Sequence, residues 1–259
     1  MVYYVVRYRR SIVFAHLKQA FPQHSEAEIT QLAKGFYRGF SEVYLEVFKT
    51  GELSEDELKR RVKFVNLDVL QPFIDQGQSI VLLSGHYCNS EWLLLSLALN
   101  ISVPVDMVYK PLHNKSVNDF MYAARSRFNV DPIDMKDFSR ELIKRKSMQR
   151  AYCISADQKP GSKSRIYTTE FLNRETSFFV GPEKIAQFVE APVAFCTMQR
   201  VKQGYYQASF KVIAEPPYQK QSDDYPITER YVRELENLIK EVPQNWLWSN
   251  RRWRSRSGK

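Results

Sequence analysis

Residues 79–99 read SIVLLSGHYCNSEWLLLSLAL, which is a short apolar run, a polar turn and a longer apolar run. The first run ends at Gly85 and predicts a strand, whereas the second, SEWLLLSLAL, predicts a helix. In open α/β sheets, ligand sites tend to lie beyond the carboxyl ends of the strands. His86 follows such a strand end and is therefore a candidate functional residue.

The segments around this unit also alternate between short apolar runs and helical patterns. Further strands are predicted for VKFVN, VPVDMVY, AYCISAD, APVAFCTMQR and YYQASFKVIAE. Further helices are predicted for SIVFAHLKQAF, SEAEITQLAKGFYRGFSEVYLEVFK, SEDELKRRV, NKSVNDFMYAARSRF, FSRELIKRKS, PEKIAQFVE and ITERYVRELENLIKEV. We therefore predict an α/β fold with a mixed, largely parallel central sheet flanked by helices and preceded by a helical N-terminal segment.

The chain is expected to form a single domain with two parts. Residues 1–61 are predicted to be a helical segment packed on the core, and residues 62–259 to be the α/β core. With 259 residues and 44% hydrophobic side chains, the chain can bury a sizeable core. Ser25 and Glu28 have the spacing of a capping box at the start of a long helix.

The cysteines and the missing motifs bear on cofactors. Cys88, Cys153 and Cys196 lie far apart and form no CxxC pair, so we interpret them as reduced, mostly buried thiols. The sequence contains no H-E-x-x-H motif, no P-loop and no Rossmann glycine fingerprint. We therefore expect neither a cofactor nor a bound metal.

The net charge of +9 is concentrated at the two ends of the chain. Eight of these charges come from Arg7, Arg9, Arg10, Arg251, Arg252, Arg254, Arg256 and Lys259. Tyrosine and tryptophan accompany these cations, a combination typical of segments at a membrane interface. Solubilising tails are one alternative. A nucleic-acid-binding module is another, although charge confined to the ends argues against a nucleic-acid groove.

No run of about 20 apolar residues occurs, so no segment is predicted to span a bilayer. The start, MVYYVV, is too short for the apolar core of a signal peptide and is followed at once by arginines. We expect a peripheral membrane protein whose anchor helix is absent or truncated in this chain.

His86 and Glu91 form a candidate proton-transfer pair. On a continuous helix, residues five apart point about 140° from each other, so the pair requires His86 to lie in the turn and Glu91 in the first helical turn. Glu91 would then reach back and fix the tautomer of the imidazole, whose other nitrogen takes a proton from a hydroxyl. A capping or ion-pairing role for Glu91 is the alternative.

Several blocks of the sequence resemble a known family. GHYCNSEW is similar to the H-x4-[D/E] motif of the lysophospholipid acyltransferase superfamily, and of the bacterial lipid A biosynthesis (lauroyl/myristoyl) acyltransferases in particular. VYKPLHN, AARSRF, SADQKPG and PQNWLWSNRRWRSR resemble further family blocks, in the family's order. The resemblance extends over essentially the whole chain, and the closing block is its most specific element.

The resemblance implies roles for individual residues. His86 would be the general base on an acceptor hydroxyl, and Glu91 would orient it and balance its charge. Arg125 would serve the oxyanion or an acidic group of the acceptor. Asp157 would orient the cations of the site.

Four other residues are implied to contact the substrate: Asn89, Lys110, Arg251 and Arg252. Lys110 stands where the family often has arginine, and Asn250 replaces the histidine that usually precedes the arginine pair. Ala124 replaces a glycine that is common before the functional arginine.

The implied activity is transfer of a fatty acyl chain from acyl carrier protein or coenzyme A to a hydroxyl of a lipid A precursor or related lipid. The enzyme would work at an anionic membrane surface, on the cytoplasmic face of the bacterial inner membrane, without specific nucleic acid. Acylation of a lysophospholipid, an aminolipid or a glycolipid is the alternative reaction. A non-catalytic membrane-binding protein is a third possibility.

Overall fold

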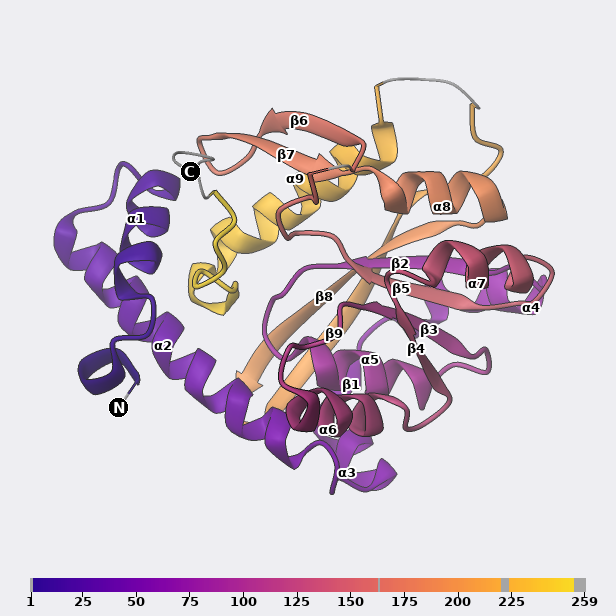
Figure 1. Cartoon of the computed structure of the whole chain (residues 1–259), viewed down its shortest axis with the longest axis horizontal. Coiled ribbons are helices and arrows are strands. Elements are labelled where there is room, and N and C mark those ends of the chain that lie inside the picture. The colour runs from indigo at the N-terminus through magenta and orange to yellow at the C-terminus, as the bar shows by residue number, and fades with distance from the viewer. Residues whose placement is uncertain (1, 163, 220–223, 254–259) are drawn as a thin grey trace.

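The structure is a computed structural model that describes residues 2–162, 164–219 and 224–253. Its centre is a seven-stranded sheet with the strand order β1-β9-β8-β2-β5-β3-β4 (Figure 1). These strands are β1 (Val62–Phe64), β2 (Ile80–Ser84), β3 (Val105–Tyr109), β4 (Val130–Asp134), β5 (Ala151–Ser155), β8 (Val193–Lys202) and β9 (Tyr205–Ala214).

The sheet is mixed and largely parallel, as predicted. β2 runs parallel to both of its neighbours, β5 and β8, and β3 runs parallel to β4 and β5. The antiparallel pair is β8 and β9, and β1 runs parallel to β9 at the edge. Gly204 turns the chain between β8 and β9 with a φ of +71°, a conformation that suits glycine.

Helices cover both faces of the sheet, which explains why residues 80–83 of β2 are all apolar. Val81 and Leu83 belong to one apolar cluster, and Ile80 and Leu82 belong to the other. The first cluster includes residues of α7 (Phe138–Arg145), α8 (Gly181–Val189) and α9 (Pro226–Glu241). The second includes residues of α3 (Glu55–Arg61), α4 (Gln71–Asp75) and α5 (Ser90–Ala98).

The N-terminal segment is helical, as predicted, and β1 begins at Val62. It comprises a π-helical turn η1 (Val2–Val6), α1 (Arg10–Ala20), α2 (Glu26–Lys49) and α3. The predicted capping box is present, because the Ser25 backbone N–H donates to Glu28 at 2.7 Å and the Glu28 N–H donates back to the Ser25 hydroxyl. In Figure 1, α2 runs along one side of the molecule from α1 to the neighbourhood of α3 and α6 (Lys115–Arg125).

Three strands were not predicted from the sequence. β4 contains Pro132, which a sheet tolerates here because β4 lies at its edge. β6 (Ile166–Glu170) and β7 (Glu175–Phe179) form a separate antiparallel pair. Two short 3-10 turns, η2 (Leu67–Val69) and η3 (Pro243–Asn245), complete the elements. Within the described ranges, no helix combines the length and the apolar character that a bilayer span requires.

Gly85 follows β2 at a point where the chain has no room for a side chain. A β-carbon added there would lie 2.7 Å from Leu235 Cδ1 and 3.5 Å from Asp157 Oδ2. Leu235 is fully buried in α9, so the contact cannot be relieved by turning a surface side chain. The absence of a side chain at position 85 therefore lets the turn that carries His86 lie against α9.

Gly85→Ala is expected to lower the free energy of unfolding by about 1–3 kcal/mol, because the added methyl group overpacks the core. Urea denaturation of the purified chain measures this change. Gly51→Ala is the matched control: its β-carbon meets only Phe120 at 3.8 Å, an ordinary contact, so a change within about 0.5 kcal/mol is expected. Equal losses in the two variants would contradict the overpacking explanation.

Candidate active site

His86 and Asp157 come together because their strands are adjacent and in register. β2 pairs with β5 so that Ser84 lies opposite Ser155. His86 lies two positions after Ser84, and Asp157 lies two positions after Ser155. Between them, the Ala156 N–H donates to the Ser84 carbonyl at 3.2 Å. The parallel pairing therefore brings the two side chains together beyond the carboxyl edge of the sheet, where His86 was predicted to lie.

The Asp157 carboxylate is buried and accepts three hydrogen bonds. Its Oδ1 lies 2.6 Å from Nδ1 of His86. Its Oδ2 accepts from the His86 backbone N–H at 2.9 Å and from the indole N–H of Trp246 at 2.8 Å. A buried carboxylate with this number of donors is satisfied and fixed in orientation, so it can hold the imidazole ring in one position.

The pairing changes the protonation of both groups. Burial lowers the pKa of His86, but the charge of Asp157 and its hydrogen bond to the ring outweigh this effect and raise that pKa above its ordinary value of 6.5. Burial raises the pKa of Asp157, yet His86 and the donated hydrogen bonds hold it below its ordinary value of 3.8. Asp157 is therefore ionised at neutral pH, and His86 is more basic than a free histidine.

The contact with Asp157 also fixes the tautomer of the neutral ring. A carboxylate only accepts, so Nδ1 carries the proton and Nε2 holds a lone pair. The side-chain nitrogen of Gln158 lies 3.0 Å from Nε2 and donates to it. Because the His86 side chain is 30% exposed, Nε2 is the ring atom available to a hydroxyl that replaces this amide.

Glu91 lies in the first turn of α5, as predicted, but it does not hydrogen-bond the imidazole. Instead, Nε of Arg125 donates to one of its oxygens at 2.8 Å, and Nη2 donates to the other. The two side chains are 17% and 15% exposed, so this fork is largely shielded from water. The charge of Glu91 still raises the pKa of His86, while that of Arg125 lowers it.

The C-terminal block WLW, residues 246–248, and the preceding η3 turn hold the His86 turn in place. The Cys88 N–H donates to the Asn245 carbonyl at 2.9 Å, and the Leu247 N–H donates to the His86 carbonyl at 3.0 Å. Tyr87 and Trp246 form an antiparallel bridge between the two segments. The backbone around His86 is thus hydrogen-bonded to a segment about 160 residues later in the chain.

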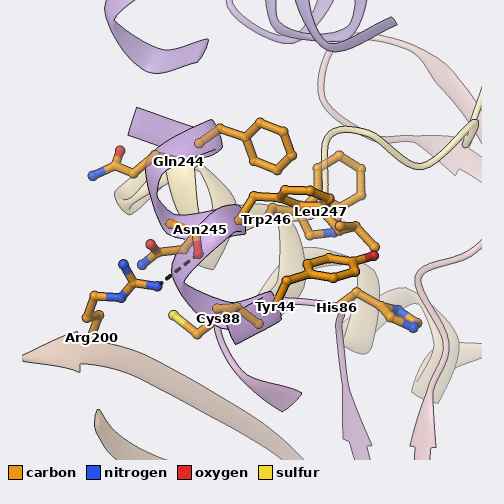
Figure 2. Close-up of a pocket in the computed structure, with 12 residues that line it drawn as sticks. Tyr44, His86, Cys88, Arg200, Gln244, Asn245, Trp246 and Leu247 are labelled. Carbon is orange, nitrogen blue, oxygen red and sulfur yellow. Dashed lines mark hydrogen bonds between the residues drawn. The ribbon is translucent and has the colours of Figure 1, made fainter. Parts of the chain in front are cut away.

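An apolar pocket opens beside His86, between α2 and the closing block (Figure 2). Its lining residues are Phe36, Gly39, Phe40, Val43, Tyr44, His86, Cys88, Arg200, Gln244, Asn245, Trp246 and Leu247. Figure 2 shows Tyr44 near His86 at one end and Arg200 at the other. Burial raises the pKa of Cys88 to about 12, so its thiol is protonated at neutral pH, in keeping with a structural cysteine.

Two residues predicted to contact substrate lie in the interior instead. Asn89 is fully buried, and its side chain caps α5 by accepting from the Trp92 N–H while it donates to Glu46 at 2.8 Å. Arg252 is buried over the ring of Phe178 and donates to the Ser177 carbonyl. Asn89 is therefore held by structural contacts, whereas Arg252 also acts electrostatically on Asp157.

The remaining predicted residues lie at the surface or outside the described ranges. Lys110 and Arg251 are exposed, and neither is brought next to His86 by a hydrogen bond or ion pair that the structure records. Arg254, Arg256 and Lys259 lie outside the described residues. In the described part of the chain, no group of three or more His, Cys, Asp or Glu residues is arranged to hold a metal ion.

The sequence did not reveal three contributors to the site. Gln158 follows Asp157 directly, and Trp246 lies in the closing block. Both therefore belong to motifs identified in the sequence, but neither was assigned a role. Tyr44 lies on α2, about 40 residues before His86, and no local pattern separates it from other aromatic residues of that helix. Only the tertiary arrangement brings it to the pocket.

Comparison with known proteins shows the family of the chain. The family model of bacterial lipid A biosynthesis acyltransferases matches residues 1–255. The chain is similar to the lipid A biosynthesis palmitoleoyltransferase of Escherichia coli (strain K12) and to the lipid A biosynthesis acyltransferase of Shigella flexneri. In each case 21% of 249 aligned residues are identical, covering 96% of this chain and 79% of the relative. The chain therefore belongs to the bacterial lipid A biosynthesis acyltransferase family.

Proposed function

We propose that this protein transfers a fatty acyl chain from an acyl thioester to a hydroxyl of a lipid A precursor or a related membrane lipid, with His86 as the general base. The donor would be carried by acyl carrier protein or coenzyme A. The observation that supports the proposal most directly is the 2.6 Å contact between Asp157 and Nδ1 of His86, which makes Nε2 the proton-accepting nitrogen of the neutral ring. Family membership supplies the class of reaction.

The proposed reaction begins when the acceptor hydroxyl replaces the Gln158 amide at Nε2 and gives its proton to that nitrogen. The hydroxyl oxygen attacks the thioester carbonyl carbon, and the carbonyl oxygen becomes an oxyanion. Collapse of this intermediate breaks the carbon–sulfur bond and leaves an ester. The imidazolium returns the proton to the departing thiolate, so no covalent acyl-enzyme is formed.

We assign Asp157 to orienting His86 and to stabilising the imidazolium, a role that the resemblance gave to Glu91. Glu91 in turn would position Arg125, because its two oxygens engage Nε and Nη2 of that guanidinium. The remaining nitrogen, Nη1, would then face the oxyanion or an acidic group of the acceptor.

The apolar pocket beside His86 would hold the part of the acyl chain nearest to the thioester. Its walls include Phe40, Val43 and Leu247, whose side chains offer apolar surface to the acyl chain. Exposed Lys110 and Arg251 would contact anionic groups of the acceptor or of neighbouring lipids.

The direct test is to incubate the purified chain with acyl-acyl carrier protein or acyl-coenzyme A and a panel of acceptors. The panel contains a lipid A precursor, a lysophospholipid, an aminolipid and a glycolipid, and mass spectrometry identifies the products. The expected product is the lipid A precursor carrying one additional ester-linked acyl group, with one thiol released per ester. Release of free fatty acid without any acylated acceptor would contradict the proposal.

His86→Ala is expected to lower kcat/KM by about 10²–10⁴, because the acceptor hydroxyl loses its general base. Thiol release from the acyl donor measures the rate. The matched control is His24→Ala, which removes a histidine that lies outside the pocket. Near-normal turnover by the His86 variant would refute the general-base assignment.

The pH dependence of kcat/KM tests the role of Asp157. Only neutral imidazole accepts a proton, so the rate is expected to rise with pH through the pKa of His86, which lies above 6.5. Asp157→Asn removes the charge that favours the imidazolium. The rise should therefore move to lower pH, and the plateau should fall because the productive tautomer is no longer fixed. Asp68→Asn, at an exposed carboxylate, should leave the profile unchanged, and an unshifted profile in Asp157→Asn would count against the pairing.

A double-mutant cycle on Glu91→Gln and Arg125→Met tests the fork. Each single substitution leaves the other charge largely buried and unpaired. The sum of the two single-variant losses in unfolding free energy should therefore exceed the loss in the double variant by about 0.5–3 kcal/mol. Urea denaturation measures all three variants. The exposed pair Lys115 and Asp119 is the control, for which no measurable coupling is expected. Strict additivity at Glu91 and Arg125 would argue that the fork does not hold in solution.

A further inference from the structure

Large apolar side chains are exposed together on two neighbouring helices beside the candidate active site. We name these residues the apolar face: Tyr44, Leu45 and Phe48 of α2 with Val117 and Phe120 of α6. Leu45 and Phe48 are each 65% exposed. Contiguous apolar surface of this kind marks an interaction site in a soluble fold, whereas scattered exposed residues do not.

α6 is an amphipathic helix that buries little of its apolar side. Val117, Phe120, Met121 and Ala124 follow one another at the spacing of one helix face. Of the residues in α6, only Ala124 is buried, while Val117 is 46% and Phe120 38% exposed. α6 therefore presents much of its apolar side to solvent.

Direct contacts make the apolar face continuous. The rings of Phe48 and Phe120 lie 6.3 Å apart, which joins α2 to α6. Towards the N-terminus, the ring centroids of Tyr44 and Phe40 lie 4.4 Å apart, and those of Phe40 and Tyr8 lie 5.8 Å apart with the rings stacked. Tyr4, Val5 and Val6, which precede Tyr8 in the sequence, are also exposed.

The apolar face borders the candidate active site on two sides. Tyr44 is half exposed and also lines the pocket that contains His86. α6 ends at Arg125, which binds Glu91 and acts electrostatically on His86. A molecule that covered this face would therefore lie at the mouth of the site.

The exposed charges next to the apolar face are mainly basic. They are Arg38, Lys49, Lys110 and Lys115, against Glu52 and Asp119. Arg38 pairs with Glu42 and Lys115 with Asp119, whereas no ion pair is recorded for Lys49 or Lys110 among the residues that the structure describes. Aromatic and aliphatic side chains bordered by lysine and arginine match the surface of an anionic bilayer, where apolar groups enter the lipid and cations stay among the headgroups.

We infer that the apolar face docks onto a membrane containing anionic lipids and presents the mouth of the His86 pocket to that membrane. The lipid acceptor then reaches His86 between Tyr44 and Arg125 without crossing water. This inference rests on the proposed function only for the nature of the acceptor, because docking itself requires no catalysis. It also moves the main membrane contact away from the C-terminal arginines, of which Arg252 is buried.

The test is cosedimentation of the full chain with vesicles of phosphatidylglycerol and phosphatidylethanolamine. The variant Leu45→Gln/Phe48→Gln/Val117→Gln/Phe120→Gln is expected to bind at least about tenfold more weakly, because each substitution removes a large apolar side chain from the lipid. The control is Ile143→Gln/Met148→Gln. These side chains are 66% and 55% exposed, and they lie on and just after α7, away from α2 and α6 in Figure 1.

A labelling experiment does not depend on multiple substitutions. A polarity-sensitive fluorophore is attached at Leu45→Cys or at Ile143→Cys, two positions of nearly equal exposure. Addition of the vesicles should shift the emission of the first label to shorter wavelength and leave the second unchanged. The unsubstituted chain gives the background from the native cysteines.

Three outcomes would overturn the inference. The first is equal vesicle binding by the face variant and the parent. The second is loss of binding in Arg251→Gln with retention in the face variant. The third is a parent dimer that the face variant breaks, which would identify a second copy of the chain as the occupant. His86→Ala should bind vesicles normally while losing acyl transfer. Vesicle binding therefore reports on docking and turnover reports on the proposed catalysis, so the failure of one can be told from the failure of the other.

Discussion

The Asp157 carboxylate is the single group on which the arrangement of the site depends. Three N–H groups donate to it: the backbone and ring of His86 and the indole of Trp246. These donors belong to the turn after β2 and to the block that closes the chain, while Asp157 follows β5. One buried charge thus ties together three segments that are distant in sequence. The bonds also compensate the cost of burying it.

The two carboxylates near His86 have separate tasks in this structure. Asp157 is buried and fixes the ring, whereas Glu91 binds Arg125 in a fork. Each acid has a cationic or cation-forming partner, and neither is left unpaired. This separation explains how a motif with one histidine and one acid can be part of a larger network in which the acid does not contact the histidine.

Much of the fold followed from local sequence patterns. The apolar β2 run, the capping box at Ser25 and the alternation of strands and helices predicted the sheet and most of its helices, because period and capping are properties of consecutive residues. β4 was missed because Pro132 disfavours a strand away from an edge, and only the assembled sheet shows that β4 is an edge.

The site was less predictable than the fold. His86 and Asp157 were both singled out, but their contact depends on the register of β2 against β5, which no local pattern specifies. Sequence proximity favoured Glu91 as the partner of His86, but in the structure Glu91 pairs with Arg125 instead. Asn89 and Arg252 were assigned to substrate because polar residues in a motif suggest function, while their burial is visible only in three dimensions.

The bonds between the His86 turn and residues 245–247 have a consequence for synthesis. A growing chain makes β2 and its histidine first, and the backbone partners of that turn and the indole that binds Asp157 follow about 160 residues later. Domains fold as units during synthesis, so contacts between segments this far apart in sequence form only after the later segment has emerged. The His86 turn and Asp157 therefore gain these backbone and indole partners only after residues 245–247 have been synthesised.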